Sequence, residues 1–127
     1  MCIRDRLRTS EDILNGFALM QQKNADSVIA VCEVDHSPLW CNTLPDDHSL
    51  SHFLNETTID SQRQSLNTYY RINGALYIVK TGIIMKTNDI YAHNCYASVM
   101  PRERSIDIDN ELDFITAEAI MKYYDTI

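Results

Sequence analysis

The segment RSIDIDNELDF, residues 104–114, carries the side chains best suited to chemistry. Asp107 and Asp109 each follow an isoleucine, and this alternation predicts a β-strand. Residues two apart in a strand point to the same face, so the two carboxylates should project together while the isoleucines face the core. Carboxylates held a few ångströms apart repel each other unless a cation lies beside them. Mg²⁺ is typically held by one or two carboxylates and substrate phosphates, so the segment predicts a Mg²⁺ site at the carboxyl end of a strand.

The spacing of these two acids leaves an ordinary structural interpretation open. Asp107 could be a solvated residue at a sheet edge, and Asp109 could cap the helix that is predicted to follow. The D-x-D pattern is too short to decide between a metal site and these roles.

The segment RINGALY, residues 71–77, is the second candidate for chemistry. The pair Asn73-Gly74 permits a positive φ, which lets the backbone turn tightly and approach a ligand. Arg71 stands just before it and could bind a carboxylate or a phosphate with a two-pronged contact. An ordinary turn into a strand, with Arg71 in solvent, explains the same pattern. Arg63 stands eight residues earlier in the polar stretch, and its pattern favours a surface arginine more than a ligand contact.

The histidines and cysteines indicate neither a zinc site nor covalent catalysis. Among the four histidines, only His48 and His52 have the spacing of a helical ligand pair, and no third ligand is evident. The four cysteines form no C-x-x-C pair, so we expect free thiols in a reducing compartment. Ser37 and Cys41 lack the setting of a catalytic nucleophile.

The composition favours one domain with a small-molecule ligand. The chain has 127 residues and a formal net charge of −7. Nucleic acids and anionic membranes both require a basic face, so neither is expected as a partner. No apolar run approaches the roughly 18–20 residues that span a bilayer. The opening MCIRDRLR lacks the apolar core of a signal peptide, so we expect a cytoplasmic protein.

The predicted elements alternate between helix and strand. Residues 9–24 predict a helix capped by Thr9 or Ser10, with an apolar face formed by Ile13, Phe17 and Met20. The valine-rich run at 27–34 suits a strand covered on both faces, as in a parallel sheet between helices, which indicates the α/β class. Further elements are predicted as a strand ending the segment 69–79, a helix at 81–87, strands at 95–100 and over SIDID, and a helix at 109–124.

Three segments taken together resemble the acylneuraminate cytidylyltransferases, the CMP-sialic acid synthetases. They are VCEVDHSPLW, R(x)7RINGALYI and MPRERSIDIDNELDF, and they follow the family's order and spacing between about Leu7 and Tyr124. The resemblance implies the back part of a Rossmann-like nucleotidyltransferase sheet. It also implies that the long polar stretch at 36–68 is a dimerisation arm, which explains a connection too long for a compact domain, and hence a homodimer.

The family's reaction, and the residues that carry it, are implied by the same resemblance. CTP and a nonulosonic acid give a CMP-sugar and pyrophosphate, with Mg²⁺ as cofactor. Asp107 and Asp109 match the catalytic, metal-binding aspartates, and Asp107 also lies near the anomeric hydroxyl that attacks the α-phosphorus. The substrate-binding residues implied are Arg71 and Tyr77 in the sugar pocket with Asn73 beside them, Arg63 closing on the substrates, and Tyr91 as an aromatic residue beside the sugar.

Two departures from the family pattern qualify the expected activity. Trp40 stands where some bacterial members carry a substrate-contacting lysine. The basic loop of the form A-R-x-G-S-K that cradles CTP has no counterpart, and CIRDR replaces the Q-P-T-S-P that precedes the matching Leu7-Arg8. We therefore expect residues 1–6 to be foreign, residues 7–127 to be a partial domain, and the isolated fragment to be inactive.

Two other functions remain open at this point. The chain could be a non-catalytic sugar-binding or dimerisation module, or a relative of the CMP-Kdo synthetases, which share the chemistry. The particular nonulosonic acid is not readable from the sequence.

Overall fold

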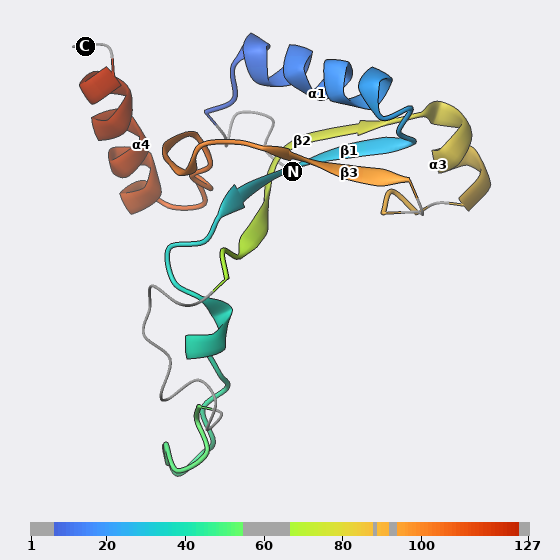
Figure 1. The fold of residues 1–127 in the computed structure, drawn as a ribbon. Helices are drawn as coiled ribbons and strands as arrows, with labels where there is room; N and C mark the ends of the chain where they lie inside the picture. Colours follow the sequence, from blue (N-terminus) through green and yellow to red (C-terminus); the bar gives the residue numbers. More distant parts are fainter. Residues whose placement is uncertain (1–6, 55–66, 88, 92–93, 125–127) are drawn as a thin grey trace. The chain divides into compact units, whose positions relative to one another are not determined.

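The computed structural model describes residues 7–54, 67–87, 89–91 and 94–124. These residues form a small α/β structure with one three-stranded sheet and three α-helices (Figure 1), so the predicted α/β class is confirmed. The elements are α1 (Ser10–Gln22), β1 (Ser27–Glu33), the 3₁₀ turn η1 (Pro38–Trp40), β2 (Tyr70–Val79), α3 (Thr81–Thr87), β3 (Cys95–Val99), the 3₁₀ turn η3 (Arg102–Arg104) and α4 (Glu111–Tyr124).

The chain divides into two compact units. Met1–Cys32 and Arg71–Ile127 form the first, and Glu33–Tyr70 forms the second. In the second unit, no described residue is buried, and its only regular element among the described residues is η1. The predicted arm at 36–68 falls inside this unit. Its role in dimerisation stays a prediction, and residues 55–66 lie outside the described part of the chain.

The sheet is mixed, with strand order β2-β1-β3. β1 runs parallel to β3. β2 runs the other way, because the N–H of Lys80 donates to the carbonyl of Asp26 (2.9 Å) and, at the opposite end, the N–H of Val34 donates to the carbonyl of Tyr69 (3.0 Å). The expectation of a parallel arrangement therefore holds for β1 and β3 only.

The predicted burial of the first strand is confirmed. Along β1, Val28 and Ala30 are fully buried, as is the thiol-bearing Cys32. One buried cluster joins Val28 to Ala25 and Ile78. A second consists of Ala30, Ala75 and Met100, and Leu76 of β2 packs against both clusters. The core therefore consists of small side chains around the central strand.

α1 begins at the predicted cap. The Thr9 hydroxyl accepts a hydrogen bond from the N–H of Asp12 (3.3 Å), and the Asp12 carboxylate accepts one from the N–H of Thr9 (2.8 Å). This reciprocal capping box satisfies two of the N–H groups that have no partner within the helix.

The predicted apolar face of α1 is correct only for Met20, which packs against the cluster of Val28 and Ile78. Ile13 and Phe17 are 36% and 50% exposed, whereas Gly16 is buried. A Cβ at Gly16 would lie only 2.7 Å from Ile78 and 2.8 Å from Leu76. The helix therefore packs against β2 with the side that carries Gly16. Without a side chain at this position, the helix can come closer to the sheet than a side with large residues could.

The SIDID segment is not a strand. The N–H of Met100 extends the pairing of β3 to the Val31 carbonyl (2.8 Å), and Pro101 follows, which has no N–H to donate. The chain then makes the turn η3 and runs without regular structure over residues 105–109. Aspartate and isoleucine alternate along this segment, which suggested a strand, but the burial of these residues does not alternate.

The remaining predicted elements are confirmed, with small shifts at their ends. The last helix starts at Glu111 rather than at residue 109. In the described residues, no helix combines the length and the apolar character that crossing a membrane requires.

Candidate functional site

The two motifs that could do chemistry meet at Ser105. This residue is fully buried and stands just before the acidic segment at 106–109. Its hydroxyl donates to the carbonyl of Pro101 (2.7 Å), which closes the turn η3. Two residues of β2, Arg71 and Asn73, also bind Ser105. The strand that carries RINGA thus holds the start of the acidic segment.

Asn73 acts as a buried anchor between the motifs. It is 2% exposed, and its amide donates to the Ser105 hydroxyl (2.9 Å) and to the sulfur of Met100 (3.6 Å). Its side-chain oxygen accepts a hydrogen bond from the N–H of Ala75 (3.0 Å). This last contact spans Gly74, whose φ of 71° confirms the positive φ predicted there. The side chain is thus engaged within the protein, and a contact of Asn73 with substrate stays a prediction.

Arg71 is exposed to solvent, and one nitrogen of its guanidinium makes a hydrogen bond within the protein. Its Nη2 donates to the carbonyl of Ser105 (2.9 Å), and the residue is exposed. A guanidinium carries five N–H donors in a planar fork. Arg71 can therefore keep its contact with Ser105 and still donate to an anionic ligand near the acidic segment.

The cap of α4 is provided by Asn110 and Asp113. Asn110 accepts a hydrogen bond from the N–H of Asp113 (3.0 Å), and the Asp113 carboxylate accepts one from the N–H of Asn110 (3.2 Å). The same carboxylate accepts one from the N–H of Asp109 (3.1 Å). The Asp109 carboxylate is therefore not the helix cap, and that alternative for Asp109 is wrong.

Asp107 is half-buried and Asp109 is exposed. Their carboxylates are the hard oxygen donors that Mg²⁺ prefers, and two are sufficient when substrate phosphates complete the coordination. Within the described residues, no cluster of three or more His, Cys, Asp or Glu side chains could hold a metal ion. A site here would therefore take its other ligands from the substrate or from water, and Mg²⁺ stays a prediction.

The predicted tyrosines lie toward the other end of the sheet. The hydroxyl of Ser27, the first residue of β1, donates to the carbonyl of Ile90 (2.6 Å), and Tyr91 follows directly. Tyr77 lies three residues before Lys80 in the sequence. The N–H of Lys80 donates to the carbonyl of Asp26, the residue before β1. Both tyrosines are exposed. The structure thus brings together Arg71, Asn73 and the acidic segment, but not Tyr77 and Tyr91, and Arg63 lies outside the described residues.

Two charged residues absent from the predicted site bind each other beside it. Arg104 Nη2 donates to a carboxylate oxygen of Asp12 over 2.6 Å. Burial, the largest single effect, raises the pKa of Asp12. Hydrogen bonds from the Thr9 backbone, Arg104 and the Thr9 hydroxyl, with the charge of Arg104, together outweigh burial and hold the pKa below its ordinary value. Nothing in the spacing of Asp12 along the sequence relates it to Arg104.

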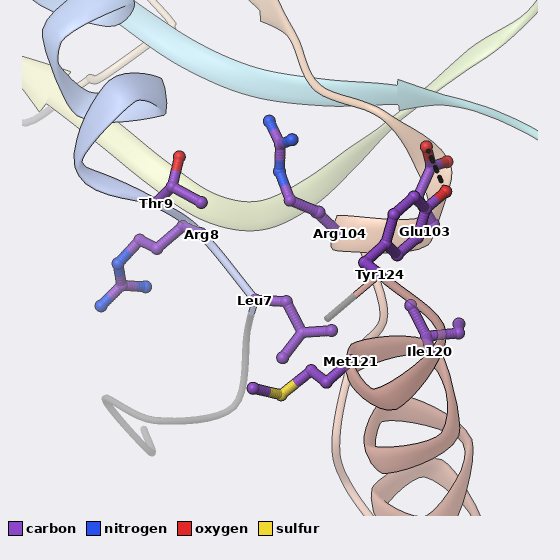
Figure 2. A pocket seen from close by; sticks show the side chains of 8 residues that line it. All are labelled: Leu7, Arg8, Thr9, Glu103, Arg104, Ile120, Met121 and Tyr124. Carbon is purple, nitrogen blue, oxygen red and sulfur yellow. Dashed lines mark hydrogen bonds between the residues drawn. The ribbon is translucent and has the colours of Figure 1, made fainter. Parts of the chain in front are cut away.

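A pocket of about 510 Å³ opens beside this ion pair (Figure 2). Across it, the hydroxyl of Tyr124 donates to the carboxylate of Glu103 (3.2 Å). Burial and this acceptor raise the pKa of the Tyr124 phenol. The pocket is lined by Leu7, Arg8, Thr9, Glu103, Arg104, Ile120, Met121 and Tyr124.

Comparison with known proteins finds several relatives of this chain. No family model matches the chain. It is 28% identical over 118 residues to the post-translational flagellin modification protein B of Campylobacter coli, covering 91% of this chain and 48% of that protein. It is 28% identical over 111 residues to the N-acylneuraminate cytidylyltransferases of Streptococcus agalactiae serotypes V and III, covering 86% of this chain and 26% of each of them.

The predicted resemblance to the acylneuraminate cytidylyltransferases is confirmed. The chain spans about half the length of the Campylobacter relative and about a quarter of the streptococcal ones.

Proposed function

We propose that this chain forms the sugar- and metal-binding part of a cytidylyltransferase that activates a sialic-type nonulosonic acid with CTP. The products would be the CMP-sugar and pyrophosphate. The main supporting observation is that Arg71 and Asn73 both bind Ser105, so that the RINGA motif is fixed against the start of the acidic segment. The names of the streptococcal relatives support the reaction class.

In this proposal the reacting end of the sheet is the one with Arg71, Asp107 and Asp109. Asp107 and Asp109 would hold Mg²⁺, which when bound would neutralise charge on the phosphates of CTP. Asp107 would lie near the anomeric hydroxyl of the sugar. As the new bond forms between the anomeric oxygen and the α-phosphorus, the bond from that phosphorus to pyrophosphate breaks. The exposed guanidinium of Arg71 would bind the carboxylate of the sugar acid.

The remaining predicted residues have secondary roles in the proposal. Asn73 would keep the acidic segment in place, Arg63 would close on the substrates, and Tyr77 and Tyr91 would contact parts of the sugar remote from the reacting carbon. The arm at 36–68, within the unit Glu33–Tyr70 in which no described residue is buried, would form the contact of a homodimer.

The names of the relatives suggest which sugar acids to compare. One relative is named for flagellin modification and the others for N-acylneuraminate. N-acetylneuraminic, legionaminic and pseudaminic acids share the carboxylate and the anomeric hydroxyl that the proposed site would use. A panel of the three therefore tests the reaction class and the sugar at the same time.

The deciding experiment is pyrophosphate release from CTP and each sugar acid in the presence of Mg²⁺. The chain is assayed as it stands and joined to a family-type amino-terminal half that carries the basic CTP-binding loop. We expect turnover by the joined protein and its loss in the Asp109→Ala variant, with dimerisation unchanged in sedimentation. Asp26→Ala, which removes an exposed ion pair with Lys80 (3.0 Å), is the matched control and should retain activity. Absence of turnover with all three acids would overturn the proposal in favour of a binding module.

A further inference from the structure

Three consecutive residues before the acidic segment each bind a different element. Glu103 accepts a hydrogen bond from Tyr124 of α4 (3.2 Å). Arg104 donates to Asp12 of α1 (2.6 Å), and Ser105 is bound by β2. The backbone that leads into Asp107 and Asp109 is therefore fixed from three directions, and Figure 2 shows one of these contacts, between Glu103 and Tyr124.

The contact with α1 is the ion pair among the three. The side chain of Asp12 is 7% exposed and that of Arg104 is 37% exposed. The Asp12 oxygens also accept hydrogen bonds from the N–H and the hydroxyl of Thr9 (2.8 and 2.9 Å). A carboxylate held by several donors has a defined orientation, and charge-assisted hydrogen bonds are about twice as strong as neutral ones.

Arg104 depends on this carboxylate for its position. Its Nε is buried and has no hydrogen-bond partner among the described residues. A buried donor without a partner destabilises the arrangement. Loss of Asp12 would therefore leave a partly buried guanidinium with fewer acceptors, and the simplest relief is movement of Arg104 out of the pocket toward water.

We infer that Asp12 is a positioning residue for the acidic site, acting through Arg104 on the backbone that carries Asp107 and Asp109. This inference rests on the proposed function, since it concerns the same metal-binding carboxylates. Binding constellations need their groups held within about 0.5 Å. A shift of η3 would be passed to Asp107 directly, because residues 105–109 have no strand or helix of their own to resist it.

The test uses the whole chain with Mn²⁺ as the probe, since free Mn²⁺ can be quantified by its electron paramagnetic resonance signal. We expect the unaltered chain to bind Mn²⁺ and the Asp109→Ala variant to lose binding. Asp12→Asn should weaken Mn²⁺ affinity by about tenfold, the lower end of the effect of removing a residue that orients a metal ligand.

Two control variants separate positioning from general stability. Glu118→Gln removes an exposed ion pair with Lys122 on α4 (3.2 Å) and keeps both partners of the Asp12–Arg104 pair. Asp26→Asn removes the ion pair with Lys80, which lies away from the acidic segment. Both should bind Mn²⁺ within about twofold of the unaltered chain, since neither touches residues 103–109. If Asp12→Asn fails to fold, Arg104→Lys keeps the charge but loses the planar fork, and it should show the same weakening.

Hydrogen exchange without metal gives a second, independent measurement. The N–H of Ser105 donates to the Arg102 carbonyl (2.9 Å) and that of Asp109 to the Asp113 carboxylate (3.1 Å). Asp12→Asn should accelerate exchange at both amides by about tenfold or more, and Asp26→Asn should not.

The outcomes distinguish the inference from the function on which it rests. If the unaltered chain binds Mn²⁺ but Asp12→Asn changes neither affinity nor exchange, the positioning role is wrong and the proposed metal site stands. If the unaltered chain binds no Mn²⁺ while Asp12→Asn accelerates exchange, the proposed metal site is wrong, and Asp12 is only a structural residue.

Discussion

The side-chain amide of Asn73 donates a hydrogen bond to the hydroxyl of Ser105 over 2.9 Å. Both residues are buried, and they belong to motifs that lie far apart in the sequence. The contact joins the middle of β2 to the segment that follows η3. Because of this contact, a substitution in the RINGA motif should alter the acidic segment even if the substituted residue contacts no ligand.

Replacing Asn73 by alanine should lower the free energy of unfolding by about 2 kcal/mol. The variant leaves the Ala75 N–H without its partner at 3.0 Å, and a buried unpaired group destabilises by roughly 1–3 kcal/mol. Urea unfolding of the chain measures the difference. Asn42→Ala is the control, because Asn42 is exposed and its amide binds the Phe53 carbonyl (3.0 Å). Its effect should stay within about 0.5 kcal/mol, and equal losses in the two variants would contradict the anchoring role.

Gly74 should not tolerate a side chain, whereas Gly82 should. The φ of Gly74 is 71°, a conformation that disfavours L-residues by roughly 1–2 kcal/mol, so Gly74→Ala should destabilise the chain by that amount. Gly82 lies in α3 with nothing within 4 Å of an added Cβ. Gly82→Ala should therefore stabilise by up to about 0.8 kcal/mol, from helix propensity. Thermal unfolding of both variants checks the pair, and a stable Gly74→Ala would show that this backbone relaxes.

Local patterns in the sequence predicted most elements of this fold correctly. The cap at Thr9 and the positive φ at Gly74 follow from side-chain and backbone chemistry within a few residues. The buried strand β1 was equally clear, because an unbroken apolar run needs cover on both faces.

The errors have long-range causes. The acidic segment alternates like a strand, yet Pro101 ends the ladder and Ser105 is tied to β2 instead. The face of α1 was correct at Met20 but not at Ile13 or Phe17, because the helix approaches the sheet along Gly16. The pair of Asp12 and Arg104 could not be predicted, since nothing local to either residue indicates a partner so far along the chain.

The stability of the chain should depend on pH through Asp12. Its pKa is lower in the folded state than its ordinary value, so the ionised carboxylate contributes stability above the ordinary aspartate range. That contribution is lost as the pH falls below about 4 and through the folded pKa. The loss of unfolding free energy caused by Asp12→Asn should therefore be largest near pH 6 and shrink toward pH 3, as measured by urea unfolding. Gly74→Ala changes no titratable group, so its loss of unfolding free energy should be the same at every pH. A loss that does not change with pH for Asp12→Asn would contradict the ion pair.

Asp113 should couple the stability of α4 to the geometry of the acidic segment. Its carboxylate accepts hydrogen bonds from the N–H groups of both Asp109 and Asn110 (3.1 and 3.2 Å). Asp113→Ala should destabilise by about 1 kcal/mol, as other lost caps do. It should also accelerate hydrogen exchange at the Asp109 amide, because that N–H loses its acceptor.

The control for this prediction is Glu118→Ala on the same helix. Glu118 forms an exposed i,i+4 pair with Lys122 (3.2 Å), and such pairs contribute only about 0.3–0.5 kcal/mol. Glu118→Ala should leave exchange at Asp109 unchanged. If both variants accelerate exchange at Asp109 equally, the effect comes from fraying of α4 as a whole. If Asp113→Ala alone does so, the carboxylate of Asp113 fixes the backbone that carries one of the two proposed metal ligands.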